Sequence, residues 1–197
     1  MKTETHRFFA LWLIDKYLGE LPAVYRAAFY IGCMEPDYSV ISYLYGFFTR
    51  PFYGHDYENR RKWLEKRLDR LENFSLSSVG LFKLGRLVHF LCDAFTRVHN
   101  YPCHGNFYSH ARYEKRLNSA MKSALFNDGT VYASGTGKPE PISEHERYIC
   151  GDPSPENDCR YIIDFAVSVI KYALPKENLN SEKRKFYPGI SKERPII

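Results

Sequence analysis

The chain has no CxxC pair and no long apolar run, and these absences exclude several classes of protein. Its cysteines are odd in number and widely spaced, which argues against a disulfide framework and for a reducing compartment. No apolar segment approaches the roughly 20 residues that a membrane-spanning helix needs. The short apolar run over residues 8–14 is followed by Asp15 and Lys16 and not by a small-residue cleavage site, so no secretion signal is expected. We therefore expect a soluble, cytoplasmic protein.

Patterns typical of β-strands, internal repeats and low-complexity segments are also missing, whereas helical periodicity covers most of the chain. The expected helices are residues 8–18, 21–31, 37–46, 57–73, 84–99, 107–126 and 159–174. Pro36 is expected to break the chain, and Asp37 to cap the helix that follows. With 197 residues and 44% hydrophobic content, the chain can bury one substantial core. The sequence therefore predicts an all-α, compact single-domain bundle of several helices.

The helical domain is expected to span residues 1–174. The segment at about 126–156 is rich in Gly, Pro and polar residues and predicts a long surface loop or lid. Residues 175–197 are expected to form a basic C-terminal tail. The net charge of +5 and the pI near 8.9 favour anionic partners such as phosphate esters, nucleic acid or acidic membrane surfaces, without choosing among them.

Potential metal ligands interrupt the apolar pattern of LGRLVHFLCDAFTRVH, residues 84–99. Residues four apart lie on one face of a helix, so His89 and Asp93 can hold one cation together. The same spacing recurs in His110 and Glu114. His99 lies about three helical turns beyond His89, too far along for the same ion, and suits a second ion with His110 and Glu114. The spacing alone therefore suggests two metal sites.

A structural explanation exists for each of these residues taken alone. An isolated helical histidine is often a core or surface residue, and a His-xxx-Asp pair often only stabilises its helix. However, burying Asp93 without a partner would be costly, and a metal would compensate its charge. A row of ligands beside an apolar row is typical of metal sites inside helix bundles. Cys92 is expected to be a small buried residue and not a ligand.

The order of further ligands makes a family resemblance specific. His6, Asp37 in EPDY and His55 in FYGH precede HFLCDAFTRVH and HARYE, and this order resembles the zinc-dependent phospholipase C family. That family includes bacterial phosphatidylcholine-hydrolysing enzymes and the alpha-toxin catalytic domain, and its distant relatives are the tri-zinc nucleases that cut single strands. The resemblance covers roughly residues 1–120. Taken alone, these three residues also fit a surface position, a helix cap and a turn.

The resemblance implies an all-helical fold with up to three zinc ions in a cleft. One ion would be held by Asp37, His55, His89 and Asp93. Asp93 would bridge to a second ion, held by His6 and by the amine and carbonyl of Met1, and the third would be held by His99, His110 and Glu114. Imidazole and carboxylate ligands suit hydrolytic zinc and also fit manganese or iron. His104 and His145 match no family position.

Three residues bear on the substrate. Tyr38 and Phe52 match places where choline-hydrolysing relatives carry aromatic head-group contacts, and a quaternary ammonium gains cation-π energy there. Ordinary packing explains both aromatic residues equally simply. Arg97 stands where relatives usually carry proline, and it is either a solvated helix-end cation or a contact for an anionic substrate group.

The resemblance implies a zinc-dependent phosphodiester hydrolase of phospholipase C type, acting on a phospholipid or a smaller phosphodiester. In such a site, two ions sharing Asp93 would activate a water, and Asp37 would orient or deprotonate it. Two alternatives stay open. The KRK and KER runs of the tail lend modest support to a single-strand-specific nuclease. A metal-stabilised binding protein without turnover has the same ligand pattern.

Overall fold

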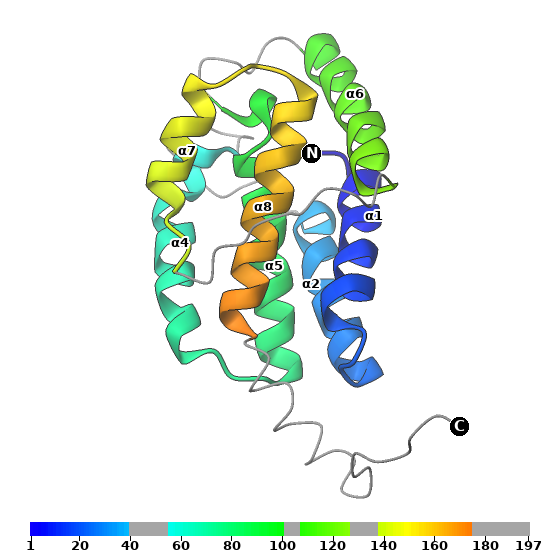
Figure 1. The fold of residues 1–197 in the computed structure, drawn as a ribbon, viewed down its shortest axis with the longest axis vertical. Helices are drawn as coiled ribbons and strands as arrows, with labels where there is room; N and C mark the ends of the chain where they lie inside the picture. The colour runs from blue at the N-terminus through cyan, green and yellow to red at the C-terminus, as the bar shows by residue number, and fades with distance from the viewer. Residues whose placement is uncertain (40–54, 101–106, 127–137, 175–197) are drawn as a thin grey trace, which may run out of the picture.

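The computed structural model describes residues 1–39, 55–100, 107–126 and 138–174, and within these ranges the chain forms α-helices and no β-strand (Figure 1). The α-helices are α1 (Thr3–Leu13), α2 (Ala23–Tyr38), α4 (Tyr57–Asp69), α5 (Ser78–Ala94), α6 (Phe107–Phe126), α7 (Pro141–Cys150) and α8 (Pro155–Ala173). Shorter helical turns cover Ile14–Leu18, Arg70–Asn73 and Arg97–His99. The all-α prediction is confirmed. Among the described helices, none combines the length and apolar character needed to cross a membrane.

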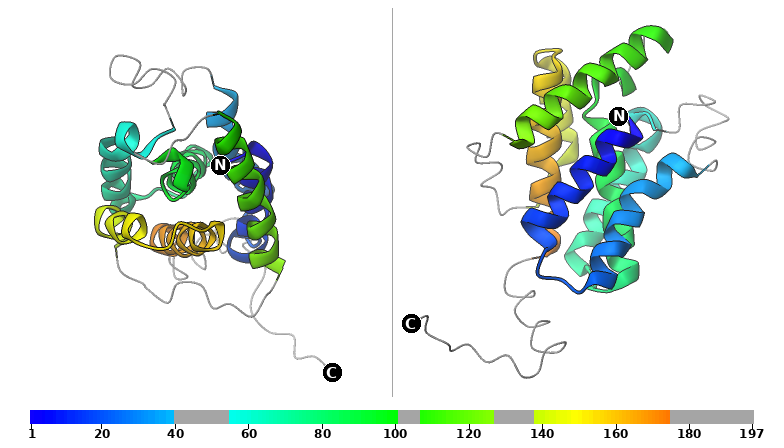
Figure 2. Two further views of the ribbon diagram at one scale, coloured as in Figure 1. Left: turned by 90° about the horizontal axis from the view of Figure 1, so that it is seen from above. Right: turned by 90° about the vertical axis from the view of Figure 1, so that its right-hand side faces the viewer.

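Helix α5 lies at the centre of the bundle. Figure 2 shows it surrounded by α4 on one side, α1, α2 and α6 on another, and α7 and α8 on a third. Its side chains are apolar on nearly all faces, as expected of a helix buried from several directions. The helix begins where the Ser77 hydroxyl accepts a hydrogen bond from the Gly80 N–H at 3.0 Å. Its C-terminal end carries His89 and Asp93 into the interior of the bundle.

Two glycines allow α2 and α5 to approach each other closely. A Cβ atom at Gly85 would overlap the backbone of Phe29, and one at Gly32 would overlap the backbone of Phe82. The backbones can therefore pack at a distance that no other residue type permits at these positions. This packing places the Cys33 carbonyl of α2 next to the His89 side chain of α5.

The predicted helix over residues 84–99 ends early, at Ala94. Thr96 has extended backbone angles, and Arg97–His99 form a separate 3-10 turn. The side-chain amide of Asn100 donates to the carbonyls of Ala94 and Thr96 at 3.0 and 2.9 Å. If the helix continued, these two carbonyls would accept hydrogen bonds from backbone N–H groups of the next turn, and the Asn100 amide takes the place of those donors. The predicted continuous ligand helix from 89 to 99 is therefore wrong at its last turn.

The prediction that Pro36 ends its helix is also wrong. Helix α2 runs through Pro36 to Tyr38, and Asp37 lies inside its last turn and does not cap a new helix. A proline removes one helical hydrogen bond, but Pro36 is buried and α2 packs against α5, and tertiary packing of this kind supplies most of the stability of a helix. Residues 40–54, with most of the predicted helix 37–46, lie outside the described ranges.

A helix also occupies part of the predicted loop at 126–156. Residues 141–150 form α7, which begins with Pro141 in its first turn, where the missing proline N–H costs nothing. His145 and Tyr148, three residues apart, form its buried face. The abundance of Gly, Pro and polar residues concealed this short amphipathic pattern.

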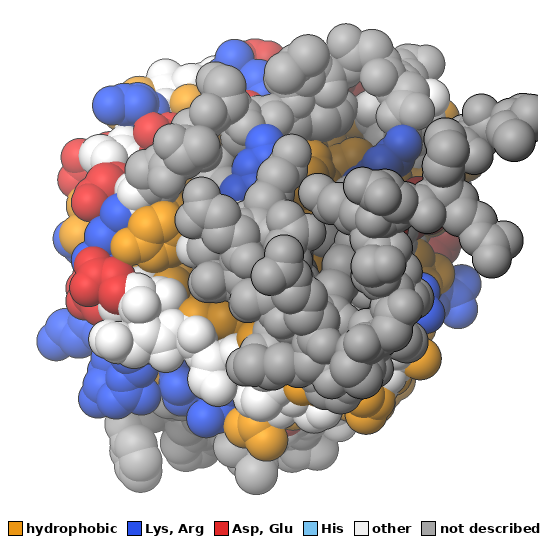
Figure 3. All heavy atoms as spheres, turned by 60° about the horizontal axis from the view of Figure 1, so that its bottom comes forward, with side chains coloured by type: hydrophobic (Ala, Val, Ile, Leu, Met, Phe, Trp, Pro, Cys, Tyr) orange, Lys and Arg blue, Asp and Glu red, His pale blue; other side chains and the backbone are white. Residues whose placement is uncertain are grey.

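The end of the bundle where α5 begins is distant from the predicted ligands. Its visible described side chains are a mixture of basic, acidic and apolar groups (Figure 3). A pocket of about 380 Å³ lies between the Arg70–Asn73 turn and the start of α5, and Arg67, Arg70 and Lys83 contribute its cationic groups. None of the predicted ligands lines this pocket.

Candidate metal centre

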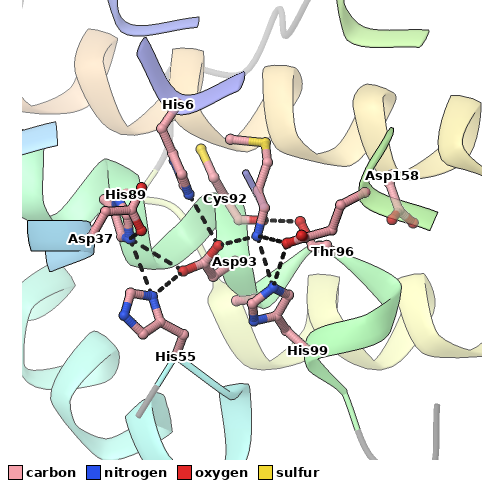
Figure 4. Close-up of polar contacts among 12 residues, drawn as sticks. His6, Asp37, His55, His89, Cys92, Asp93, Thr96, His99 and Asp158 are labelled. Atoms are coloured by element: carbon pink, nitrogen blue, oxygen red, sulfur yellow. Dashed lines mark hydrogen bonds and ion pairs between the residues drawn. The ribbon is translucent and has the colours of Figure 1, made fainter. Parts of the chain in front are cut away.

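The carboxylate of Asp93 lies at the centre of the predicted site and is fully buried (Figure 4). Its Oδ1 atom lies 2.7 Å from the amine of Met1 and 3.1 Å from Nε2 of His6. Its Oδ2 atom lies 2.7 Å from Nδ1 of His55 and 3.3 Å from Nε2 of His89. These groups come from the chain start, from α1, from the segment before α4 and from α5. The fold therefore assembles ligands that are far apart in the sequence.

The described residues contain three groups of side chains whose potential ligand atoms lie within 4.8 Å of one another. The groups are His6, His89 and Asp93; Asp37, His55 and His89; and His99, His110 and Glu114. Every member was predicted from the sequence. The third group has the predicted composition, whereas His89 belongs to both of the first two groups.

The Met1 amine lies between Asp93 and the third group. It donates hydrogen bonds to Oδ1 of Asp93 at 2.7 Å and to Nε2 of His99 at 2.8 Å. It also lies 3.3 Å from the Glu114 carboxylate. Burial disfavours its charge, but attraction by Asp93 and Glu114 outweighs burial and raises the pKa of the amine above its usual value of 8.0. In the metal-free molecule the ammonium thus neutralises part of the negative charge of the site.

The His89 ring has the tautomer expected of a metal ligand. Its Nδ1 atom lies 2.8 Å from the Cys33 carbonyl, which can only accept, so this nitrogen carries the proton. The other nitrogen, Nε2, faces Asp93 and Asp37, whose Oδ1 lies 3.6 Å away, and it is the nitrogen that carries the lone pair in the neutral ring. A backbone carbonyl that fixes the ring in this way is a common feature of histidine metal ligands.

Two buried histidines are neutral at pH 7. Burial lowers the pKa of His6 to about 4, and the neighbouring His89 acts in the same direction. Burial and the positive Met1 amine lower the pKa of His99 to about 4. A neutral imidazole keeps a lone pair for a metal, whereas an imidazolium has none. Both rings are therefore prepared for metal binding.

Asp93 and Glu114 are ionised at pH 7. Burial would raise the pKa of Asp93, but the charge of the Met1 amine and the three nearby imidazoles of His99, His89 and His6 hold it well below its usual value. Burial opposes ionisation of Glu114 too, but the neighbouring His110 and His99 side chains and the positive Met1 amine outweigh it and lower the pKa of this carboxyl. Neutral imidazoles and ionised carboxylates are the forms in which these side chains bind cations.

The polar atoms present fit a bound cation. Oδ2 of Asp37 is buried and has no hydrogen-bond partner in the described part of the chain. A buried carboxylate oxygen without a partner is costly, and a water bound to a cation at the Asp37, His55 and His89 group would satisfy it. Nitrogen and oxygen donors from histidine and carboxylates suit zinc. The residues therefore fit the metal that the sequence resemblance implies.

The model of one protein family, described as zinc dependent phospholipase C, matches residues 5–174. The chain belongs to the zinc-dependent phospholipase C family. The match begins just before His6 and extends past the expected limit near residue 120 to include α7 and α8. Comparisons with curated proteins and with solved structures give no match. The family name indicates zinc-dependent phospholipase C chemistry.

The structure describes two of the three residues that were predicted to contact substrate, Tyr38 and Arg97. Tyr38 follows Asp37 at the end of α2 and is 76% exposed. The Arg97 guanidinium donates to the Ile149 carbonyl at 3.0 Å, which ties it to α7. Phe52 lies outside the described residues, as does His104. Substrate contacts by these residues stay predictions.

Cys92 is fully buried between the ligand residues of α5 and the core. Burial, together with the neighbouring Asp93 charge, raises the pKa of its thiol well above the usual value of 9.0. Metals bind the thiolate form of cysteine. Cys92 belongs to none of the three ligand groups found among the described residues, and its exclusion as a ligand stays a prediction.

Sequence reasoning missed the polar residues that hold the ligand-bearing turn. Asn100 accepts a hydrogen bond at 2.8 Å from Nε2 of His145, which is stacked on Tyr57. Asp158 accepts a hydrogen bond from the Arg97 backbone N–H at 2.9 Å. No sequence signal pointed to these roles, because His145 lay in an expected loop and Asp158 resembled an ordinary acidic residue at a helix start.

Proposed function

We propose that this chain is a zinc-dependent phosphodiester hydrolase of the phospholipase C type, acting on a phospholipid or a smaller phosphodiester. The observation that carries the proposal is the buried Asp93 carboxylate, which contacts the ligand groups of His6, His55 and His89 at 2.7 to 3.3 Å. The family of the chain supports the same chemistry.

Zinc would be held by the three groups of ligands already described. Asp93 can contribute one oxygen to each of two positions, because Oδ1 faces His6 and Oδ2 faces His55. His99, His110 and Glu114 would hold a further ion. When bound, zinc polarises phosphate oxygens and lowers the pKa of water to near neutrality.

Asp37 is the residue best placed to accept the proton of an attacking water. One of its oxygens faces His89 at 3.6 Å, and the other, Oδ2, is buried and has no hydrogen-bond partner in the described ranges. A general base must have a free acceptor atom close to the proton that it removes. In this proposal Oδ2 orients the water and receives its proton as the water oxygen attacks phosphorus. The bond from phosphorus to the ester oxygen of the departing alcohol then breaks, and that oxygen leaves as an alcohol after taking a proton from solvent water.

Tyr38 is the described residue best placed to contact an alcohol head group. Its ring is exposed and directly follows Asp37 at the end of α2. A quaternary ammonium above such a ring is stabilised by cation-π attraction. The position of Tyr38 therefore favours a substrate whose head group is choline or a similar quaternary ammonium.

The test combines metal analysis with a comparison of substrates. Protein that begins at Met1 is loaded with zinc, its metal content is measured, and it is assayed against phosphatidylcholine, a soluble choline phosphodiester and single-stranded DNA. We expect up to three zinc ions and cleavage of at least one choline ester. Cleavage of DNA alone would instead indicate a nuclease, and no turnover by fully loaded protein would indicate a binding protein.

A further inference from the structure

A fully buried carboxylate outside the metal centre joins four elements of the fold. Asp158, in the first turns of α8, accepts hydrogen bonds at Oδ2 from the Arg97 backbone N–H at 2.9 Å and from the Tyr113 hydroxyl at 3.0 Å. Its Oδ1 accepts from the Tyr148 hydroxyl at 2.8 Å. These donors lie in the Arg97–His99 turn, in α6 and in α7.

Two of the three donors lie beside residues of the third ligand group. Arg97 precedes His99 by two residues in the same 3-10 turn, and Tyr113 directly precedes Glu114 in α6. Both donate to the same oxygen atom of Asp158. That atom therefore sets the spacing between the turn that carries His99 and the helix that carries Glu114. Tyr148 uses the other oxygen and belongs to α7.

The turn depends on this carboxylate for its first hydrogen bond. The Arg97 N–H opens the 3-10 turn, and among the described residues its acceptor is the Asp158 side chain. A side chain that accepts from the first N–H groups of a helical segment fixes where that segment starts. Here the acceptor comes from another helix, so α8 determines the position of the His99 turn.

A buried carboxylate is a costly way to fill this space. Apolar residues of similar volume often stabilise a core as well as buried polar groups do. What a carboxylate adds is directional acceptance of several hydrogen bonds at fixed positions. This property is useful where the spacing of two segments has to be set accurately.

We infer that Asp158 is a positioning residue for the third zinc position, holding His99 and Glu114 at ligand spacing through the Arg97 N–H and the Tyr113 hydroxyl. The inference rests on the proposed function, because it requires zinc at His99, His110 and Glu114. Residues that hold metal ligands in place commonly contribute about 10- to 100-fold to metal affinity.

The experiment compares two tyrosine variants that differ by the same single hydroxyl. Tyr113→Phe removes the bond next to Glu114, and Tyr148→Phe removes the bond to α7 as the matched control. Asp158→Asn is the third variant, and His110→Ala identifies which step of a zinc titration belongs to this group. Zinc affinity is measured by competition with a chelator, and thermal unfolding of each metal-free variant reports its stability.

We expect Tyr113→Phe and Asp158→Asn to weaken the step identified by His110→Ala by about tenfold or more, leaving the other steps unchanged. Tyr148→Phe should bind zinc as the unsubstituted protein does. Equal losses in both tyrosine variants, or no loss in Tyr113→Phe, would overturn the inference. If Asp158→Asn does not fold, the tyrosine pair still decides the question.

The same titration separates this inference from the proposed function. If the unsubstituted protein lacks a zinc step that His110→Ala removes, no third position exists and the inference is wrong. If all expected zinc steps and their changes are found but no phosphodiester is cleaved, the proposed function fails and the positioning role of Asp158 is supported.

Discussion

At the scale of single residues, the two aspartates of the candidate centre have different surroundings. Asp93 is surrounded by the Met1 amine and by imidazoles at 2.7 to 3.3 Å, so both of its oxygens are engaged. Asp37 differs, because its Oδ2 has no hydrogen-bond partner in the described part of the chain. The two carboxylates should therefore respond differently to the same amide substitution.

Asp37→Asn is expected to keep most of the zinc and to lose catalytic rate. An amide oxygen can still face a metal, but it cannot accept a proton at neutral pH. Loss of a general base typically lowers a rate by about 10²- to 10⁴-fold. The measurement is kcat at full zinc loading, with Asp69→Asn on the exposed surface of α4 as the control. A fully active, fully loaded Asp37→Asn protein would exclude this role.

The Met1 amine offers a second test at the residue scale. Adding residues before Met1 converts its ammonium into an amide and removes the ion pairs with Asp93 and Glu114. We expect the extended protein to bind less zinc and, when metal-free, to unfold at a lower temperature than protein that begins at Met1. The same residues added after Ile197 serve as the control. Equal zinc content and equal rates in all three proteins would contradict a ligand role for the amine.

At the scale of elements, the seam between α2 and α5 determines the orientation of His89. The Gly32 and Gly85 positions allow the two backbones to approach, and the Cys33 carbonyl then reaches Nδ1 of His89 at 2.8 Å. Separating the two helices would release the ring from this hydrogen bond. A substitution at either glycine would therefore affect the metal centre only indirectly, by changing the distance between α2 and α5.

Gly85→Ala is therefore expected to reduce both stability and zinc affinity. The added methyl group overlaps the Phe29 carbonyl, and overpacking of this kind commonly costs about 1 to 3 kcal/mol. Denaturant unfolding of the metal-free protein and a zinc titration measure the two effects. Gly19→Ala is the control, because a Cβ atom there would lie 3.2 Å from the Asp15 carbonyl oxygen, compared with 2.2 Å from the Phe29 carbonyl oxygen at Gly85. Unchanged zinc affinity in Gly85→Ala would show that the seam does not orient His89.

The helices with a clear apolar pattern could be predicted from the sequence, and their interruptions could not. The range predicted for α6 agrees with the structure, because its polar and apolar residues alternate with helical spacing throughout. The break after Ala94 depends on Asn100, whose side-chain bonds form only after the turn has folded. Helix α7 was missed because its apolar face is short. Local patterns carry no information about such contacts.

Most residues of the candidate site could be predicted, because their signal is local in the sequence. Ligand residues have a chemical identity that is visible in the sequence, and the spacing of His89 with Asp93 and of His110 with Glu114 follows from helix geometry. The residues that hold those ligands in place have no such signature. Asp158 contacts Arg97 and Tyr113 across long intervals of the chain, and only the fold shows that they meet.

At the scale of the whole molecule, buried titratable groups make stability depend on pH. Burial lowers the pKa of His6, His99 and His145 to about 4, below their usual 6.5, so the unfolded chain binds more protons between these values. Their contribution to stability is present above pH 6.5 and is lost as the pH falls toward 4. Asp158 acts in the opposite direction, because burial raises its pKa to about 6 and stability falls as it ionises.

The metal-free protein is therefore expected to be less stable at pH 5 than at pH 7. Three histidines favour the higher pH and one carboxyl opposes them, so the net change is expected to be a few kcal/mol. Chelator-treated protein is unfolded with denaturant at both values. In Asp158→Asn, which lacks the opposing group, the difference should become larger. Equal stability at the two pH values would contradict the expected balance.

The hydrogen bond from His89 to the Cys33 carbonyl also bears on how the family can diverge. Because the acceptor is a main-chain atom, substitution of the Cys33 side chain does not remove it. The side chain at position 33 can therefore change during evolution while the imidazole proton stays on Nδ1. The hydrogen bond instead requires the two small residues, Gly32 and Gly85, that keep the helices close. Among homologues, selection on this part of the centre should leave its mark at those glycines and not at the residue that makes the bond.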